Sequence, residues 1–198
     1  MIIDTHCHAG KNWFLPIESL EFEMNQAGVD GAVLIQHGGT FDKDYLFDEA
    51  AKRGDRFKVV VMVDPADPDP LGTLEILAEQ GAAGVRIAPD GAFNALAYVT
   101  DIWRKAGSLG LVISSIGDDK RFASDSFKKI IDECPDTQIV IEHLAGVGIT
   151  DAPYTDYESA LECAERPNTT IKVPGLGEIT PRPPILLPDF RFDNIPPL

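Results

Sequence analysis

The sequence predicts an α/β fold, a (β/α) TIM-like barrel with seven βα units visible and the eighth strand missing. Short apolar runs rich in β-branched residues alternate with helical patterns along the 198 residues, as in parallel strands joined by helices. The units recur about every 25–30 residues, and a complete eight-stranded barrel needs about 250. No GxGxxG follows the first strand, so a doubly wound nucleotide-binding sheet is the weaker alternative.

The first strand, residues 1–3, is apolar and runs directly into Asp4. Pro16 and Gly28 bound the first helix, Asp42 can cap the second, and Pro135 stops the sixth. The other strands are predicted at residues 31–39, 57–65, 83–89, 111–117, 137–146 and 169–175. The helices between them are predicted at residues 17–28, 42–54, 71–81, 94–110, 118–134 and 155–167.

We predict one domain, with six βα units in residues 1–170 and the seventh strand in residues 171–198. The latter segment holds seven of the 15 prolines among many apolar residues. It cannot form a regular helix, and we expect it to pack as a loop over the barrel mouth. The first and seventh strands should not pair. We expect either an incomplete barrel, through truncation or an absent remainder of the chain, or a gap that a partner closes, with a homo-oligomer as one form of such a partner.

Composition excludes several classes of partner. The 17 Lys and Arg against 32 Asp and Glu give a net charge of −15, so nucleic acid and anionic membranes would be repelled. No apolar run is long enough for a membrane span and the start lacks signal-peptide regions, so we expect a cytoplasmic protein. Cys7, Cys134 and Cys163 form no CxxC pair, which predicts buried thiols rather than disulfides or a thiolate zinc site.

The chemistry is concentrated in the first ten residues. On a strand Asp4, His6 and His8 would project to one side, and Thr5 and Cys7 to the other. Two imidazoles at this spacing can close on one metal ion or one water. His6 and His8 are therefore the first candidates for a site that holds either a divalent metal or a water.

All four histidines lie at the ends of predicted strands, and His37 and His143 are the other two. The carboxyl ends of parallel strands form the active-site face of such folds, so all four can share one site. Two alternatives stay open, namely a core histidine at His143 beside Glu142 and a simple turn residue at His37.

The sequence resembles the amidohydrolase-related family (amidohydrolase 2 type), metal-dependent hydrolases and decarboxylases with a TIM-barrel fold. The resemblance is carried by DTHCH, GVRIAP, IEHLAG and IKVPGLGEI, which begin at residues 4, 84, 141 and 171. It implies that His6 and His8 are metal ligands, with zinc the first candidate, and that Asp4 belongs to the catalytic motif. It also implies that His143 binds or polarises the substrate.

This sequence departs from the family pattern at two positions of the metal site. The fifth strand offers only Ser114 and Ser115 where metal-dependent members have a histidine, and no eighth strand with its aspartate is predicted. Some members that hydrolyse lactones of dicarboxylic acids work without a metal and hold the substrate with arginines. Arg86, inside an apolar strand, fits that role, and the alternative is an internal salt bridge to Glu142 or Asp64. For Lys172, also inside an apolar strand, the same two roles stay open, namely a substrate anchor and an internal salt bridge.

These residues together predict an enzyme that hydrolyses a small cyclic ester or amide, one that carries a carboxylate. Arg86 and His37 would bind the substrate, and His143 would polarise the scissile carbonyl. The nearer alternative is a non-oxidative decarboxylase of an aromatic or muconate-type acid. The alternative of another class is a non-catalytic binding barrel. Trp13 and Trp103 are assigned to packing.

Overall fold

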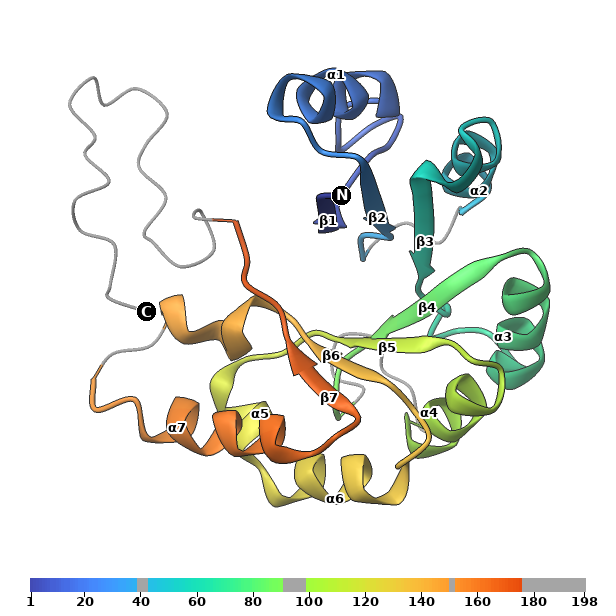
Figure 1. The fold of residues 1–198 in the computed structure, drawn as a ribbon. Coiled ribbons are helices and arrows are strands. Elements are labelled where there is room, and N and C mark those ends of the chain that lie inside the picture. The colour runs from blue at the N-terminus through green and yellow to red at the C-terminus, as the bar shows by residue number, and fades with distance from the viewer. Residues whose placement is uncertain (39–42, 91–98, 150–151, 176–198) are drawn as a thin grey trace.

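A computed structural model of the chain describes residues 1–38, 43–90, 99–149 and 152–175. Seven strands form one parallel sheet in sequence order, and in Figure 1 the sheet is curled with the helices on its outer side. The strands are β1 Ile3–Cys7, β2 Gly31–Ile35, β3 Phe57–Val61, β4 Ala82–Ile87, β5 Val112–Ser115, β6 Ile139–Ile141 and β7 Thr169–Ile171. The fold is the predicted α/β incomplete TIM-like barrel, and among the described residues β1 and β7 do not pair.

A helix follows each of the first six strands. The helices are α1 Ile17–Ala27, α2 Asp44–Ala51, α3 Pro70–Glu79, α4 Val99–Ser108, α5 Asp119–Ala123, α6 Asp125–Glu133 and α7 Thr155–Leu161. Gly28 ends α1 with φ 70°, as a left-handed C-cap does. The Asp69 side chain accepts a hydrogen bond from the Gly72 amide at 3.0 Å and so caps α3. The cap at Asp42 and the start of the fourth helix at residue 94 lie outside the described residues.

The single helix predicted over residues 118–134 is wrong, because the chain breaks it at Ser124. Ser124 has extended dihedrals, φ −67° and ψ 145°, between α5 and α6. Its hydroxyl accepts a hydrogen bond from the Phe127 amide at 3.2 Å, which makes Ser124 the N-cap of α6. Serine competes with helix continuation in this way, and periodicity alone does not register it.

The core lies between the outer face of the sheet and the helices. Its largest fully buried side chains include Trp103, Phe122, Phe127 and Leu34. The three cysteines are free and buried, as predicted. The prediction that Trp13 has a packing role is wrong, because 81% of Trp13 is exposed and it does not pack in this core.

The inner face of the sheet borders a cavity of about 350 Å³. Its lining is mostly apolar and includes several polar side chains. The lining includes Thr5, Val33, Lys58, Val60, Ala83, Val112, Ser114, Val140, Thr170 and Lys172. Residues 176–198 of the Pro-rich segment lie outside the described residues, so its packing over the barrel mouth stays a prediction.

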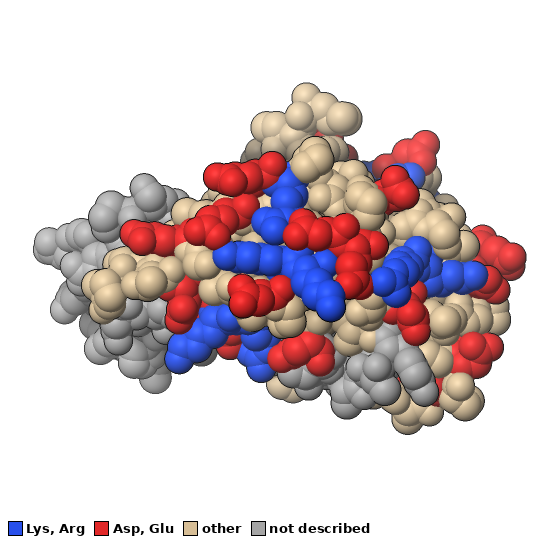
Figure 2. All heavy atoms as spheres, turned by 90° about the horizontal axis from the view of Figure 1, so that it is seen from below, with Lys and Arg blue, Asp and Glu red and all other residues tan. Residues whose placement is uncertain are grey.

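Ion pairs connect the helices on the lower side of the molecule, where Figure 2 shows basic and acidic side chains interleaved. Arg104 of α4 contacts Glu133 of α6 at 2.8 Å, and Arg166 contacts Asp132 at 2.7 Å. Exposed pairs of this kind contribute about 0–1 kcal/mol each. None of the helices in the described ranges is long and apolar enough to cross a lipid bilayer.

Candidate active site

The site begins at a bulge in β1. Asp4 pairs with Ala32 and Cys7 pairs with Leu34, so three steps along β1 match two along β2. Ala32 and Leu34 are buried on the outer, helix-covered side of the sheet, and Asp4 and Cys7 share that side. Burial and a hydrogen bond with Asp4 raise the pKa of the Cys7 thiol. The predicted alternation therefore fails for Asp4, whose carboxylate accepts from the His6 amide at 2.9 Å.

His6 and His8 do converge as predicted. Their Nε2 atoms are 3.2 Å apart, and the ring centroids 4.9 Å. His8 Nδ1 lies 2.7 Å from the carbonyl oxygen of Ile35, which can only accept, so Nδ1 carries the proton and Nε2 is left with a lone pair. Burial lowers the pKa of His6 to about 2 and that of His8 to about 4, so both imidazoles are neutral at pH 7.

A left-handed turn brings Glu142 and His143 to the same place. Regular strand geometry would put these neighbours on opposite faces. Instead β6 ends at Ile141, and His143, Leu144 and Ala145 have φ between 49° and 54°. His143 Nε2 then lies 3.5 Å from Glu142 Oε2, and the His143 ring centroid 4.6 Å from that of His6. Backbone strain of this kind, about 1–3 kcal/mol per residue, is typical of functional sites.

Glu142 is the centre of a buried charged cluster. Arg86 donates to it from Nε at 3.1 Å and from Nη2 at 2.7 Å, and the Ser114 hydroxyl donates at 2.6 Å. Lys172 Nζ lies 3.7 Å away and donates to Ser114. Burial would raise the pKa of Glu142, but Arg86 and Lys172 outweigh it and hold the pKa at about 2. Burial lowers the pKa of Lys172, and Glu142 opposes that shift.

Arg86 thus forms a salt bridge with Glu142, which was one of the two alternatives that the sequence left open for it. Its role as a substrate anchor stays a prediction. Sequence reasoning treated Glu142 only as a partner and missed it as the centre of the site. The signal was present, because an acid within IVIEH, an arginine within GVRIA and a lysine within TTIKV are each costly to bury unless they meet.

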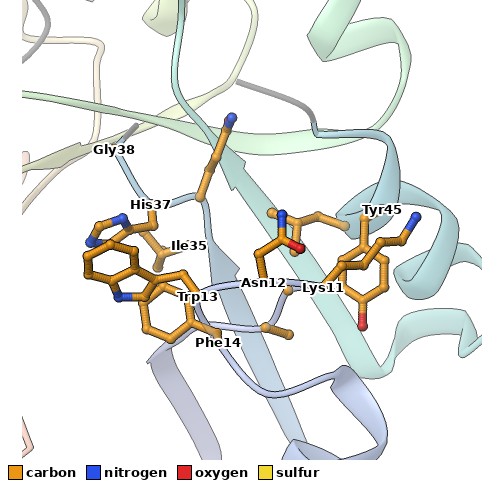
Figure 3. A pocket seen from close by; sticks show the side chains of 12 residues that line it. Lys11, Asn12, Trp13, Phe14, Ile35, His37, Gly38 and Tyr45 are labelled. Atoms are coloured by element: carbon orange, nitrogen blue, oxygen red, sulfur yellow. The ribbon is translucent and has the colours of Figure 1, made fainter. Parts of the chain in front are cut away.

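His37 lies at the end of β2, beside His8. Its ring centroid is 5.7 Å from that of His8 and 5.2 Å from that of Phe14. The Trp13 ring stacks on the His37 ring with a centroid distance of 5.6 Å. His37 therefore borders both the pair of metal-binding candidates and a separate cavity, which Figure 3 shows.

The donors fit a divalent metal. Two nitrogen ligands of a tetrahedral ion, each at about 2.0–2.1 Å, stand about 3.3 Å apart, close to the separation seen for His6 and His8. His6 Nδ1 is buried without a hydrogen-bond partner among the described residues and faces Glu142 Oε1 at 3.9 Å. A proton on this atom would leave both Nε2 lone pairs facing each other, which a cation would relieve. His6, Glu142 and His143 also offer ligand atoms within 4.8 Å of one another.

Comparison with known proteins places the fold among solved structures of similar architecture. A structure from Acinetobacter baumannii, described as a probable 2-pyrone-4,6-dicarboxylic acid hydrolase with citric acid bound, matches with TM-score 0.71 at 19% identity, over 90% of this chain and 72% of that one. A zinc-containing amidohydrolase from Burkholderia multivorans matches with TM-score 0.72 at 18% identity, over 91% and 72%.

An amidohydrolase 2 from Bifidobacterium longum subsp. infantis matches with TM-score 0.62 at 21% identity, over 88% of this chain and 73% of that one. A comparison with curated proteins gave no match. At these identities the structures establish the fold. The amidohydrolase family model matches residues 3–195, nearly the whole sequence. The chain belongs to the amidohydrolase family and is a hydrolase of that family.

Proposed function

We propose that this chain hydrolyses a small lactone or cyclic amide that carries a carboxylate. The observation that carries the proposal is the convergence of His6 and His8, 3.2 Å apart, beside Glu142 and His143. Neutral imidazoles, a buried carboxylate and a third histidine can position a water against a carbonyl carbon and stabilise the oxyanion that forms. The similar structure that is described as a probable 2-pyrone-4,6-dicarboxylic acid hydrolase supports this substrate class.

In this proposal His6 and His8 hold a divalent metal, with zinc as the first candidate. Such an ion, when bound, lowers the pKa of a water and polarises a carbonyl. The Ile35 carbonyl orients the His8 ring, and Glu142 faces the second nitrogen of His6, as carboxylates commonly do behind histidine ligands. The zinc in the Burkholderia structure supports the choice of metal.

The remaining residues have proposed roles around this centre. His143 polarises the scissile carbonyl, and His37 contacts the rest of the substrate. Asp4 acts as a positioning residue rather than at the reacting atoms, because it binds the His6 amide and stabilises the bulge. Arg86 can anchor the substrate carboxylate only if that carboxylate shares the guanidinium with Glu142.

The decarboxylase alternative has no specific observation in its favour. Its tight metal site needs a histidine on the fifth strand, and in the structure Ser114 occupies β5 and donates to Glu142. We also infer a cytoplasmic location and no nucleic-acid partner from composition. We also propose a homo-oligomer, because among the described residues β1 and β7 each have a neighbouring strand on one side only.

The test combines metal analysis with a substrate panel. We expect about one zinc or manganese per chain, and loss of that metal in the variant His6→Ala/His8→Ala. The control Asp132→Asn removes an exposed carboxylate of α6 and should keep the metal. Lactones and cyclic amides, with and without carboxylates, are then assayed for ring opening with added zinc or manganese.

Ring opening of a carboxylated lactone or cyclic amide by the wild type and the control, but not by the double variant, is the expected result. The proposal would be overturned if the double variant opened the ring at the wild-type rate. It would also be overturned if the wild type opened no compound faster than the double variant does. Turnover that survives chelation and still requires both histidines would keep the hydrolase and remove the metal.

A further inference from the structure

A second cavity lies beside the candidate active site and takes no part in the chemistry proposed above. Its volume is about 350 Å³, within the usual range of about 300–1,000 Å³ for small-molecule sites. The chain between β1 and α1, the end of β2 and the start of α2 form its walls. The residues that matter here are Lys11, Trp13, Phe14, His37 and Tyr45, all labelled in Figure 3.

One wall is aromatic and continues from the active site. Phe14 stacks on His8 with ring centroids 4.5 Å apart and planes at 19°, and Trp13 stacks on His37 at 5.6 Å and 20°. His37 covers part of the indole, yet 81% of Trp13 remains exposed. An indole held in place by stacking and open to a cavity can stack against the ring of a ligand.

The other side of the cavity carries a positive charge. Lys11 Nζ lies 5.3 Å from the centroid of the Tyr45 ring, and Tyr45 is itself fixed because its hydroxyl accepts from the Ile17 amide at 2.9 Å. Within the described ranges no carboxylate lies within 4.0 Å of Lys11, although the chain has a net charge of −15. Figure 3 shows Lys11 and Tyr45 on the side opposite Trp13 and His37.

We propose that this cavity is a binding subsite for an aromatic carboxylate group, with its ring on Trp13 and His37 and its carboxylate toward Lys11. The subsite would hold a part of the substrate that is not cleaved, and in this respect the inference rests on the proposed function. The stacked rings of His8 and Phe14 lie between the candidate active site and this subsite. A ligand that occupies both the active site and the subsite therefore passes this pair.

The test uses small probes, so that binding is measured without turnover. Benzoate has both features, cyclohexanecarboxylate has the charge without the flat ring, and benzyl alcohol has the ring without the charge. We expect benzoate to bind at least about tenfold more tightly than either, which corresponds to about 1.4 kcal/mol. Calorimetric titration of the full chain gives the affinities.

Fluorescence locates the ligand. The chain has two tryptophans, and Trp103 is fully buried against Phe127, so quenching of an exposed indole by benzoate reports on Trp13. Trp13→Ala and Lys11→Met should each weaken benzoate binding about tenfold. The matched controls are Phe22→Ala, at an aromatic residue that is 65% exposed on α1, and Lys129→Met, at an exposed lysine of α6.

Absence of benzoate binding would overturn the inference. So would unchanged affinity in Trp13→Ala or Lys11→Met, or equal binding of cyclohexanecarboxylate. Thermal unfolding confirms that each variant is folded, which is expected because both side chains are exposed. Binding that depends on Trp13 and Lys11 in a chain that opens no lactone or cyclic amide would keep the subsite and remove the proposed function. If the chain opens the ring but its affinity for benzoate is unchanged in Trp13→Ala and Lys11→Met, only the subsite is overturned.

Discussion

The buried carboxylate of Glu142 compensates the charges of two buried cations, Arg86 and Lys172. Its side chain is 1% exposed, and those of Arg86 and Lys172 are 7% and 8% exposed. Removing one partner of a buried ion pair costs about 3–5 kcal/mol, since the other charge is left without compensation. We predict that Glu142→Gln lowers the free energy of unfolding by about 3 kcal/mol or more.

Urea unfolding of the metal-free chain at pH 7 measures this effect. The matched control is Glu133→Gln, which breaks an exposed pair with Arg104 and should cost less than about 1 kcal/mol. The double variant Arg86→Met/Glu142→Leu should lose less than the sum of its single variants, because it removes both charges together. A Glu142→Gln variant as stable as the control would contradict the central position given to Glu142.

The neutral histidines predict a dependence of stability on pH. In the unfolded chain these imidazoles gain protons below a pKa of about 6.5, whereas the folded chain keeps His8 neutral to about pH 4 and His6 to about pH 2. The unfolded state therefore binds more protons in this window. The stabilisation is complete above pH 6.5 and is lost as the pH falls, by about 1.4 kcal/mol per pH unit for each imidazole.

Substituting His8 isolates one of these protons. Between pH 6.5 and pH 4 the metal-free His8→Gln variant should lose stability less steeply than the wild type, by the slope of one imidazole. Lys129→Met, at an exposed lysine, should keep the wild-type slope. Unfolding free energies at several pH values measure the slopes, and parallel curves for His8→Gln and the wild type would show that His8 is already charged in the folded chain.

At the residue scale the sequence predicted the meeting of His6 and His8 but not the position of Asp4. His6 and His8 are two residues apart, and their Nε2 atoms meet at 3.2 Å despite the bulge in β1. The bulge between Asp4 and Cys7 reverses the side of Asp4, and no composition rule reveals where one strand gains a residue against its neighbour. The approach of Glu142 to His143 depends on left-handed backbone at three non-glycine residues, which residue preferences disfavour.

At the scale of elements the strands were the most predictable part. Each predicted strand overlaps an observed one, because apolar β-branched runs between helices leave few alternatives, although the first strand was predicted at residues 1–3 and β1 extends to Cys7. Boundaries were less predictable, and the sixth strand is the clearest case. The predicted run over residues 137–146 ends as a strand at Ile141, since the turn that begins at His143 is stabilised by the Lys172 carbonyl, far away in sequence.

Gly84 tests how closely β4 and β5 must approach. A Cβ atom at Gly84 would lie 2.5 Å from the carbonyl oxygen of Val112, its partner on β5. This contact lies two residues from Arg86 and its partner Ser114. Gly84→Ala should therefore push the strands apart and lower the free energy of unfolding by about 2 kcal/mol, the usual cost of overpacking.

The control for this variant is Gly175→Ala, where a Cβ atom would meet nothing within 4 Å. Its stability should change by less than about 0.5 kcal/mol. Urea unfolding measures both, and an equal effect of the two substitutions would show that β4 and β5 separate without cost.

At the scale of the molecule, the curled sheet has two edges. β1 pairs only with β2 and β7 only with β6 among the described residues, whereas the strands between them have a neighbour on both sides. Alternate backbone amides of β1 and β7 therefore face away from the sheet, and Ile3 at the start of β1 is 42% exposed. Amides without a partner exchange with solvent more readily than amides between two strands.

Hydrogen exchange of the full chain tests whether these edges are open. We predict that, when the chain is dilute, the outward amides of β1 and β7 exchange at least about 100-fold faster than those of β3, β4 and β5. Slow exchange at the edges that does not depend on concentration would mean that another part of the same chain covers them. Protection that rises with concentration would mean that a second copy covers them, as the proposed homo-oligomer requires, and would show that the sheet is closed by assembly.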